Sequence, residues 1–321
     1  MRIDAAPLQG ITTYIYRRAH AELFGGVDRY FMPFLSPAAE HIITDREMRD
    51  IAPEHNRGVD AVPQVMTRKA EDFLWAAEEL AAMGYREINL NLGCPSGTVT
   101  AKGKGAGFLA DPTGLDAFFA EVFRAGMPAD TVFTVKTRLG MKSETEFPAL
   151  LEIYNRYPFA ELTVHPRVRD DFYKRSVRRE AFAAVLADCR LPVCYNGDIV
   201  TVADLERLRA DFPAVNAVML GRGLIADPAL ARKIRGGAPA ERGELERFTQ
   251  RLYREYQMAY GGRGQAAQRM KELWFYLIHL FENGEKYAKK MRRVSHPEEY
   301  EMLEAGIYRD LTLRRDAAGP L

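Results

Sequence analysis

The chain has 321 residues, of which 47% are hydrophobic and 28% are charged, and its net charge is +1 at neutral pH. This composition describes a globular protein with a full core and excludes a disordered chain. The densest apolar run, 273–280, is too short to span a bilayer, and the N-terminus lacks the apolar region of a signal peptide. We therefore expect a cytoplasmic protein with no membrane partner.

Short β-rich runs alternate with longer amphipathic segments about eight times before residue 235. Helix-start signals stand at Asp111 and Thr201, and Gly84 and Gly126 stand where helices should stop. Eight such units fit an α/β fold of the (β/α)₈ TIM-barrel type better than an open doubly wound sheet. The predicted strands are 2–6, 28–32, 61–66, 87–91, 131–136, 161–165, 192–195 and 217–220, and the predicted helices include 70–83, 113–125, 146–157 and 203–210.

After the Gly-Gly-Ala-Pro sequence at 236–239 the strand pattern stops, and only helix-compatible sequence follows. We therefore expect two domains, a catalytic barrel at 1–237 and a small C-terminal all-α helical domain at 238–321. The stretch 263–293 holds eight Lys or Arg against three Glu, a local net charge of +5. Its apolar residues Trp274, Phe275, Leu277, Ile278 and Phe281 are expected to form the core of a helical bundle with a basic face.

Polar residues stand at the end of nearly every predicted strand, and closure of a barrel would gather them at one mouth. Each has an alternative structural explanation: Gln64 as a core amide, His165 as a core histidine, Lys136 as a solvated charge. Their recurrence in successive units favours a binding site. The set comprises Pro7, Gln64, Asn91 with Cys94, Lys136 with Arg138, His165 with Arg167, Asn196 with Asp198, and Gly221 with Arg222.

Two glycine-bearing turns, 195–199 and 220–224, follow the last two predicted strands, where barrels commonly bind phosphate. A third glycine-rich segment, 103–107, follows no strand and is expected to be a mobile loop near the Cys94 turn. No dinucleotide fingerprint opens a βα unit, so the pattern favours a mononucleotide such as FMN. Lys136 would neutralise charge at the N1–O2 edge of a reduced flavin, and Gln64 would hydrogen-bond its pyrimidine edge.

Cys94 is one of three cysteines, with Cys189 and Cys194, and none forms a CxxC pair. The odd number argues against a disulfide scaffold, and we expect Cys189 and Cys194 to be buried structural thiols. A thiol with an ordinary pKa of about 8.5 is mostly protonated at neutral pH. Cys94 is therefore predicted to act as a general acid.

The ordered motifs of the chain resemble those of the flavin-dependent dihydrouridine synthases over nearly the whole length. They are Ala-Pro-Leu-Gln-Gly-Ile-Thr at 6–12 with Arg17, then Gln64, Asn-Leu-Gly-Cys-Pro at 91–95 followed by 105–107 and 111–112, Val-Lys-Thr-Arg at 135–138, His-Pro-Arg at 165–167, Asn-Gly-Asp-Ile at 196–199 and Gly-Arg-Gly at 221–223.

The resemblance implies reduction of uridine in RNA to 5,6-dihydrouridine, with NADPH as the reductant of FMN and Cys94 as proton donor to C5. It implies that tRNA is the substrate, with ribosomal RNA as an alternative, and we expect a monomer without a metal. Pro7, Leu8, Gln64, Lys136, His165, Asn196, Gly197, Asp198, Gly221 and Arg222 would hold FMN; Asn91, Arg138 and Arg167 would meet the substrate; and Arg269, Lys271, Lys289, Lys290 and Arg292 would contact RNA.

The segment 173–179 departs from the family pattern, because basic or aliphatic residues replace the usual Tyr-x-Gly and Ala-Asp-Trp elements. This departure concerns the substrate side of the site. Two alternatives stay open: a dihydroorotate- or dihydropyrimidine-type flavin oxidoreductase acting on a free base, and a flavin-bearing RNA-binding protein that needs no turnover.

Overall fold

All strands of the computed structural model, which describes residues 1–318, belong to one parallel sheet. The strand order is β3-β2-β1-β9-β8-β7-β6-β5-β4. Only Pro63 separates β3 from β4, and its carbonyl still accepts a hydrogen bond from the Asn89 amide at 3.0 Å. The two end segments are thus one strand interrupted by a residue without an N–H, and the ring closes as the predicted barrel. The strands are β1 (Arg2–Ala5), β2 (Arg29–Phe31), β3 (Ala61–Val62), β4 (Gln64–Val65), β5 (Glu87–Leu92), β6 (Val132–Arg138), β7 (Glu161–His165), β8 (Val193–Tyr195) and β9 (Ala217–Leu220).

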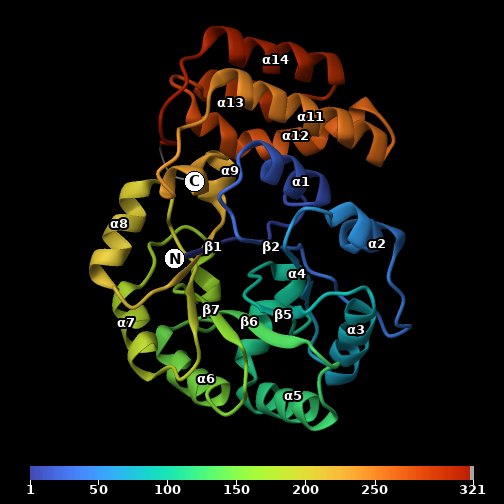
Figure 1. Cartoon of the computed structure of the whole chain (residues 1–321), viewed down its shortest axis with the longest axis vertical. Coiled ribbons are helices and arrows are strands. Elements are labelled where there is room, and N and C mark those ends of the chain that lie inside the picture. Colours follow the sequence, from blue (N-terminus) through green and yellow to red (C-terminus); the bar gives the residue numbers. More distant parts are fainter. Residues whose placement is uncertain (319–321) are drawn as a thin grey trace.

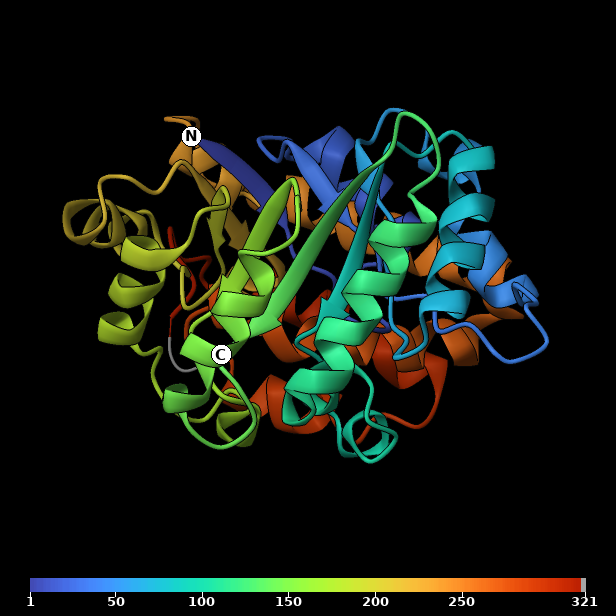
Figure 2. The ribbon, with the colours of Figure 1, turned by 90° about the horizontal axis from the view of Figure 1, so that it is seen from below.

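Helices surround the strands (Figures 1 and 2). Caps confirm three of the predicted helix-start and helix-stop signals, whereas the helix predicted at 146–157 is shorter and spans Phe147–Tyr154. The Asp111 side chain accepts the Gly114 amide at 2.9 Å, Thr201 forms a capping box, and Gly126 ends a helix with φ of 88°. The helices of this part are α1 (Tyr14–Leu23), α2 (Asp45–Ile51), α3 (Ala70–Ala82), α4 (Gly97–Thr100), α5 (Pro112–Ala125), α6 (Phe147–Tyr154), α7 (Arg179–Asp188), α8 (Val202–Asp211), α9 (Arg222–Ala226) and α10 (Leu230–Ile234), with short 3₁₀ turns η1 (Pro53–Asn56), η2 (Gly105–Ala110), η3 (Glu144–Glu146) and η4 (Arg169–Asp171).

The glycine-rich segment expected to be a mobile loop is instead a turn whose residues 105–107 are buried. Its second half forms η2, and the Ala106 amide donates to the Cys94 carbonyl at 3.1 Å. Gly105 has φ of +57°, and a Cβ there would lie 3.0 Å from Cys94 Cβ. The glycines therefore allow η2 to pack directly beneath the Cys94 turn.

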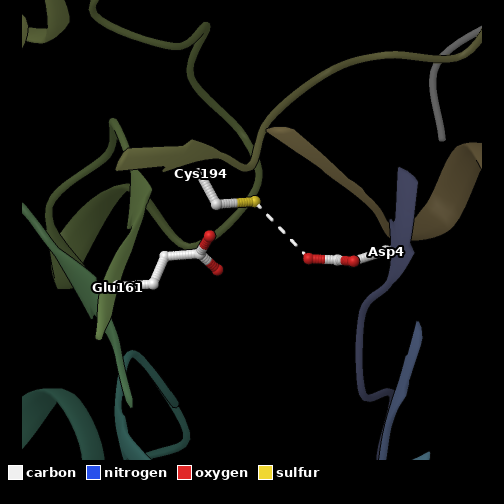
Figure 3. A group of neighbouring side chains, drawn as sticks. All are labelled: Asp4, Glu161 and Cys194. Atoms are coloured by element: carbon white, nitrogen blue, oxygen red, sulfur yellow. Dashed lines mark hydrogen bonds between the residues drawn. The ribbon is translucent and has the colours of Figure 1, made fainter. Parts of the chain in front are cut away.

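Charged side chains fill the amino-terminal end of the barrel. Figure 3 shows Asp4 and Glu161 beside the Cys194 thiol, whose Sγ lies 3.9 Å from Asp4 Oδ2. Arg29 Nη2 contacts Asp4 at 2.8 Å and Glu161 at 3.0 Å, and Arg2 pairs with both acids as well. Burial raises the pKa of Cys194 well above its ordinary value, so the thiol is uncharged. Two guanidinium groups thus already neutralise the carboxylates that a metal would require.

The remaining helices form a layer on one side of the barrel, coloured orange to red in Figure 1: α11 (Arg242–Tyr260), α12 (Arg263–Leu277), α13 (Glu285–Met291) and α14 (Pro297–Asp310), with the 3₁₀ turn η5 (Ile278–Leu280). Trp274, Leu277, Ile278 and Phe281 are buried in their core as predicted, but Phe275 is 50% exposed, so its predicted core position is wrong. Because Phe275 directly follows buried Trp274 in α12, its side chain points away from the helical core.

The core of these helices continues into the barrel through α1. Phe248 of α11 packs edge-on against Tyr16 and Phe24, with ring centroids 5.6 and 5.1 Å apart. All three rings are buried. This shared packing holds the C-terminal helices in a fixed position beside the barrel. No helix within residues 1–318 is long and apolar enough to cross a membrane.

Glu304 of α14 is a buried acid with an unpaired Oε1 among the described residues. Burial raises the pKa of Glu304 to about 7 from the value near 4.5 that it has in the unfolded chain. Ionisation of Glu304 therefore lowers the free energy of unfolding; this loss of stability is absent below pH 4.5 and reaches its full size above pH 7. We expect Glu304→Gln to stabilise the protein by about 2 kcal/mol at pH 8 and to have little effect at pH 5. Chemical denaturation at both pH values measures this difference, and an equal effect at both would contradict it.

Candidate active site

A cavity of about 290 Å³ lies at the carboxyl ends of the strands. Its lining includes every barrel residue predicted for the site, from seven different strand ends. Those residues are Pro7, Leu8, Gln64, Asn91, Cys94, Lys136, Arg138, His165, Arg167, Asn196, Gly197, Asp198, Gly221 and Arg222. Barrel closure thus brings together what the sequence separates by more than two hundred positions.

The Asn91 side chain shapes the turn that presents Cys94. Its Oδ1 accepts the amides of Gly93 at 3.0 Å and Cys94 at 2.9 Å, while its Nδ2 donates to Gln64 Oε1 at 2.6 Å. Burial raises the pKa of the Cys94 thiol above its ordinary value. The structure therefore holds a protonated thiol at the cavity wall on a turn whose direction is fixed.

Gln64 joins the cavity to a hydrogen-bonded chain inside the barrel. Its Nε2 donates to Asn89 Oδ1 at 2.7 Å, and Asn89 Nδ2 donates to Thr134 Oγ1 at 2.9 Å. Gln64 is thus a hydrogen-bonded core amide that also lines the cavity. These hydrogen bonds fix which edge of the Gln64 amide faces the cavity.

Lys136 and Arg138, two residues apart on β6, place positive charge on the same wall of the cavity. Burial, with a smaller contribution from the Arg138 charge, lowers the pKa of Lys136 to about 7. A half-buried amine whose pKa is lowered in this way is stabilised in its charged form by a negatively charged ligand. Arg138 Nε donates to the Gly93 carbonyl at 2.9 Å, but its buried Nη2 lacks a partner among residues 1–318.

His165, Arg167, Asp198 and Arg222 form one connected network. Arg167 Nη1 lies 2.9 Å from His165 Nε2, and Asp198 accepts from Arg167 at 2.6 Å and from Arg222 at 3.0 Å. Burial and the nearby cations lower the pKa of His165 well below its ordinary value, so its ring is neutral and Nε2 is the acceptor. The network therefore fixes the side-chain orientations of four residues that were predicted to contact cofactor or substrate.

Gly223 and Gly197 of the two turns each stand where a side chain would clash, Gly223 against the other turn and Gly197 against Val177. A Cβ on Gly223 would lie 2.2 Å from the Ile199 carbonyl oxygen, and one on Gly197 would lie 2.7 Å from Val177 Cγ1. A Cβ on Gly221 would meet only ordinary contacts, the nearest at 3.6 Å. The two turns therefore lie against each other, with the Gly221 backbone facing the cavity.

Two cavity residues, Tyr173 and Tyr276, were not among the predicted site residues. The Tyr173 ring lies 4.7 Å from the Arg222 guanidinium and 5.2 Å from that of Arg138. Tyr276 comes from α12 and also lines the cavity. Tyr276 comes after the barrel in the chain, and nothing in the local sequence indicates that it belongs to the site. Only the packing of the C-terminal helices brings it to the mouth of the barrel.

The predicted RNA-contacting residues divide into two groups. Arg269 and Lys271 are partly buried and bind backbone carbonyls, of Gly10 at 3.2 Å and Val294 at 2.7 Å. The other three, Lys289, Lys290 and Arg292, are exposed on and just after α13.

A family model described as dihydrouridine synthase (Dus) matches residues 4–310. The chain belongs to the dihydrouridine synthase family. Relatives of this dihydrouridine synthase include proteins of Cupriavidus necator, 33% identical with 75% of this chain and 76% of the relative covered, and of Pseudomonas syringae pv. tomato, 32% identical with 76% and 77% covered. Both are named tRNA-dihydrouridine(16) synthase.

Solved structures with the same barrel include histamine dehydrogenase from Rhizobium sp. 4-9, with a TM-score of 0.56 at 11% identity over 87% of this chain and 51% of that one. An old yellow enzyme homologue from Zymomonas mobilis gives 0.53 at 14% identity, over 75% of this chain and 90% of that one. Identities this low establish the fold alone. Family membership makes this dihydrouridine synthase a flavin-dependent oxidoreductase.

Proposed function

We propose that the protein reduces uridine 16 of tRNA to 5,6-dihydrouridine, with FMN as the flavin and NADPH as its reductant. The observation that carries the proposal is the protonated Cys94 thiol on a fixed turn, at the wall of a cavity that is also lined by the half-buried amine of Lys136. The names of the 28–33% identical relatives support the tRNA position. They favour tRNA over ribosomal RNA and over a free pyrimidine.

The residues present fit a flavin mononucleotide. Lys136 would balance negative charge at the N1–O2 edge, and the oriented Gln64 amide would bind the pyrimidine edge. The turns that bear Gly197, Gly221 and Arg222 would hold the phosphate end of the flavin. The glycines would offer backbone amides, and Arg222 would offer its positive charge. The other flavin contacts would be Pro7, Leu8, His165, Asn196 and Asp198.

When bound and reduced, FMN would supply a hydride to C6 of the uracil. Cys94 Sγ donates the proton to C5 and is reprotonated from solvent, so each turnover restores the thiol. Arg138 offers its unpaired buried Nη2, which would donate to a uracil carbonyl. Asn91 and Arg167, which line the same cavity, would complete the substrate side.

We propose that residues 238–321 form an RNA-binding domain and that the protein acts as a cytoplasmic monomer without a metal. Exposed Lys289, Lys290 and Arg292 would contact phosphates. Replacing all three by Ala should weaken tRNA binding and make its salt dependence shallower by about three in the log–log slope. A filter-binding salt series measures this, and an unchanged slope would contradict the contact. Deletion of the domain is a poorer test, because it would expose Tyr16 and Phe24 of the barrel.

Dihydrouridine mapping across total RNA, from cells with and without the gene, tests the function directly. We expect the modification to disappear from position 16 of tRNA and to persist elsewhere. Loss at another tRNA position would correct the site, and loss confined to ribosomal RNA would replace the substrate. Identical maps would reject the function.

A further inference from the structure

A second and larger cavity, of about 460 Å³, lies within the C-terminal helices. Its lining includes buried apolar side chains of α12, of α13 and of the segment between them, among them Trp274, Phe281 and Met291. Half-exposed Phe275 stands at its wall. A large aromatic ring exposed beside an apolar cavity is costly to solvate, which is typical of a surface that binds a flat apolar group.

The cavity also carries uncompensated positive charge. Lys271, Arg292 and Arg314 line it against the single carboxylate of Glu285. Within residues 1–318 none of these three cations forms an ion pair. An aromatic wall surrounded by cations is the arrangement by which proteins hold an unpaired nucleotide, with its base stacked and its phosphates neutralised.

One aromatic pair connects this cavity with the active site. The rings of Phe275 and Tyr276 lie edge to face with centroids 5.0 Å apart. Tyr276 lines the active-site cavity, and Phe275 lines the second one. An RNA strand that delivers a uridine past Tyr276 therefore has its neighbouring nucleotides within reach of Phe275.

We propose that the second cavity is a nucleotide subsite that captures one further unstacked base of the RNA, close in sequence to the reacting uridine, by stacking it on Phe275. Lys271, Arg292 and Arg314 contact the phosphates that flank this base. The inference rests on the proposed RNA substrate. It assigns the C-terminal helices a role in holding the strand open beside the reacting base, in addition to contacting the folded RNA, because a stacked base offsets part of the energy of unstacking its neighbour.

The test combines protein and RNA changes in the full-length protein. The probe is an unmodified tRNA transcript, compared with transcripts that carry an abasic nucleotide at one of the three positions on either side of uridine 16. We expect Phe275→Ala to weaken binding of the intact transcript about tenfold. For one of the abasic transcripts, binding to the unaltered protein should also be about tenfold weaker than binding of the intact transcript. Phe275→Ala should not weaken the binding of that transcript any further. Phe275→Trp should retain tight binding.

Met302→Ala is the matched control, since Met302 is an exposed apolar residue of α14 outside the cavity, and it should bind as the unaltered protein does. Equal binding by Phe275→Ala and the unaltered protein would overturn the subsite. It would also be overturned if, at every position, the loss of affinity caused by the abasic nucleotide simply added to the loss caused by Phe275→Ala. If the unaltered protein modifies tRNA while either result is found, the subsite alone is wrong. If it neither binds nor modifies tRNA, the proposed function itself fails.

Discussion

Cys94→Ala should lower the rate of dihydrouridine formation by about two to four orders of magnitude, the usual contribution of a positioned general acid. The thiol on the cavity wall is the proposed proton donor, and the Asn91 side chain holds its turn through the backbone amides of Gly93 and Cys94, so Ala preserves the turn. Single-turnover reduction of tRNA by the reduced enzyme measures the loss. Because burial raises the pKa of the Cys94 thiol above its ordinary value, the rate of the unaltered enzyme should stay level through neutral pH and fall only in alkali.

Cys189→Ala is the control, since Cys189 is a half-buried thiol that does not line the cavity. The Cys94→Ala protein should keep its flavin and its tRNA affinity. Unchanged turnover would remove the acid role and favour a protein that binds RNA without needing chemistry. A simultaneous loss of flavin and RNA would instead mean that the cavity had collapsed.

Lys136→Met should weaken FMN binding about tenfold to a hundredfold and make the bound flavin harder to reduce, because a charge-assisted contact to the ring is lost. In the unaltered protein the free-state pKa of Lys136 is about 7, and a negatively charged ligand raises it. Binding therefore takes up a proton above pH 7, and affinity should fall as the pH rises further. Flavin fluorescence titrations from pH 6 to 9 and the midpoint potential measure both effects.

Lys142→Met provides the comparison, because Lys142 is exposed shortly after the same strand. It should leave the affinity, its pH dependence and the potential unchanged. If Lys136→Met retains the alkaline weakening seen in the unaltered protein, another group is responsible and the assignment of Lys136 to the ring is wrong.

The sequence by itself determined the barrel and most of its mouth. Hydrophobic period locates strands and helices because each element must bury one face, and parallel strands place their carboxyl ends on one side. Gln64, Cys94, Lys136 and His165 can therefore be grouped from the order of the residues alone. The prediction of a loop at 103–107 is wrong, since nothing local shows that Gly105 is needed to pack against Cys94.

Only the tertiary structure decided what surrounds those residues. Burial lowers the Lys136 pKa, Asp198 joins Arg167 to Arg222, and α12 brings Tyr276 to the cavity while turning Phe275 outward. Each depends on segments far apart in the chain meeting in space, as Phe248 meets Tyr16 and Phe24. Local pattern reports which face of a segment is apolar. The partner that covers that face is set by packing between segments, which no single stretch of sequence encodes.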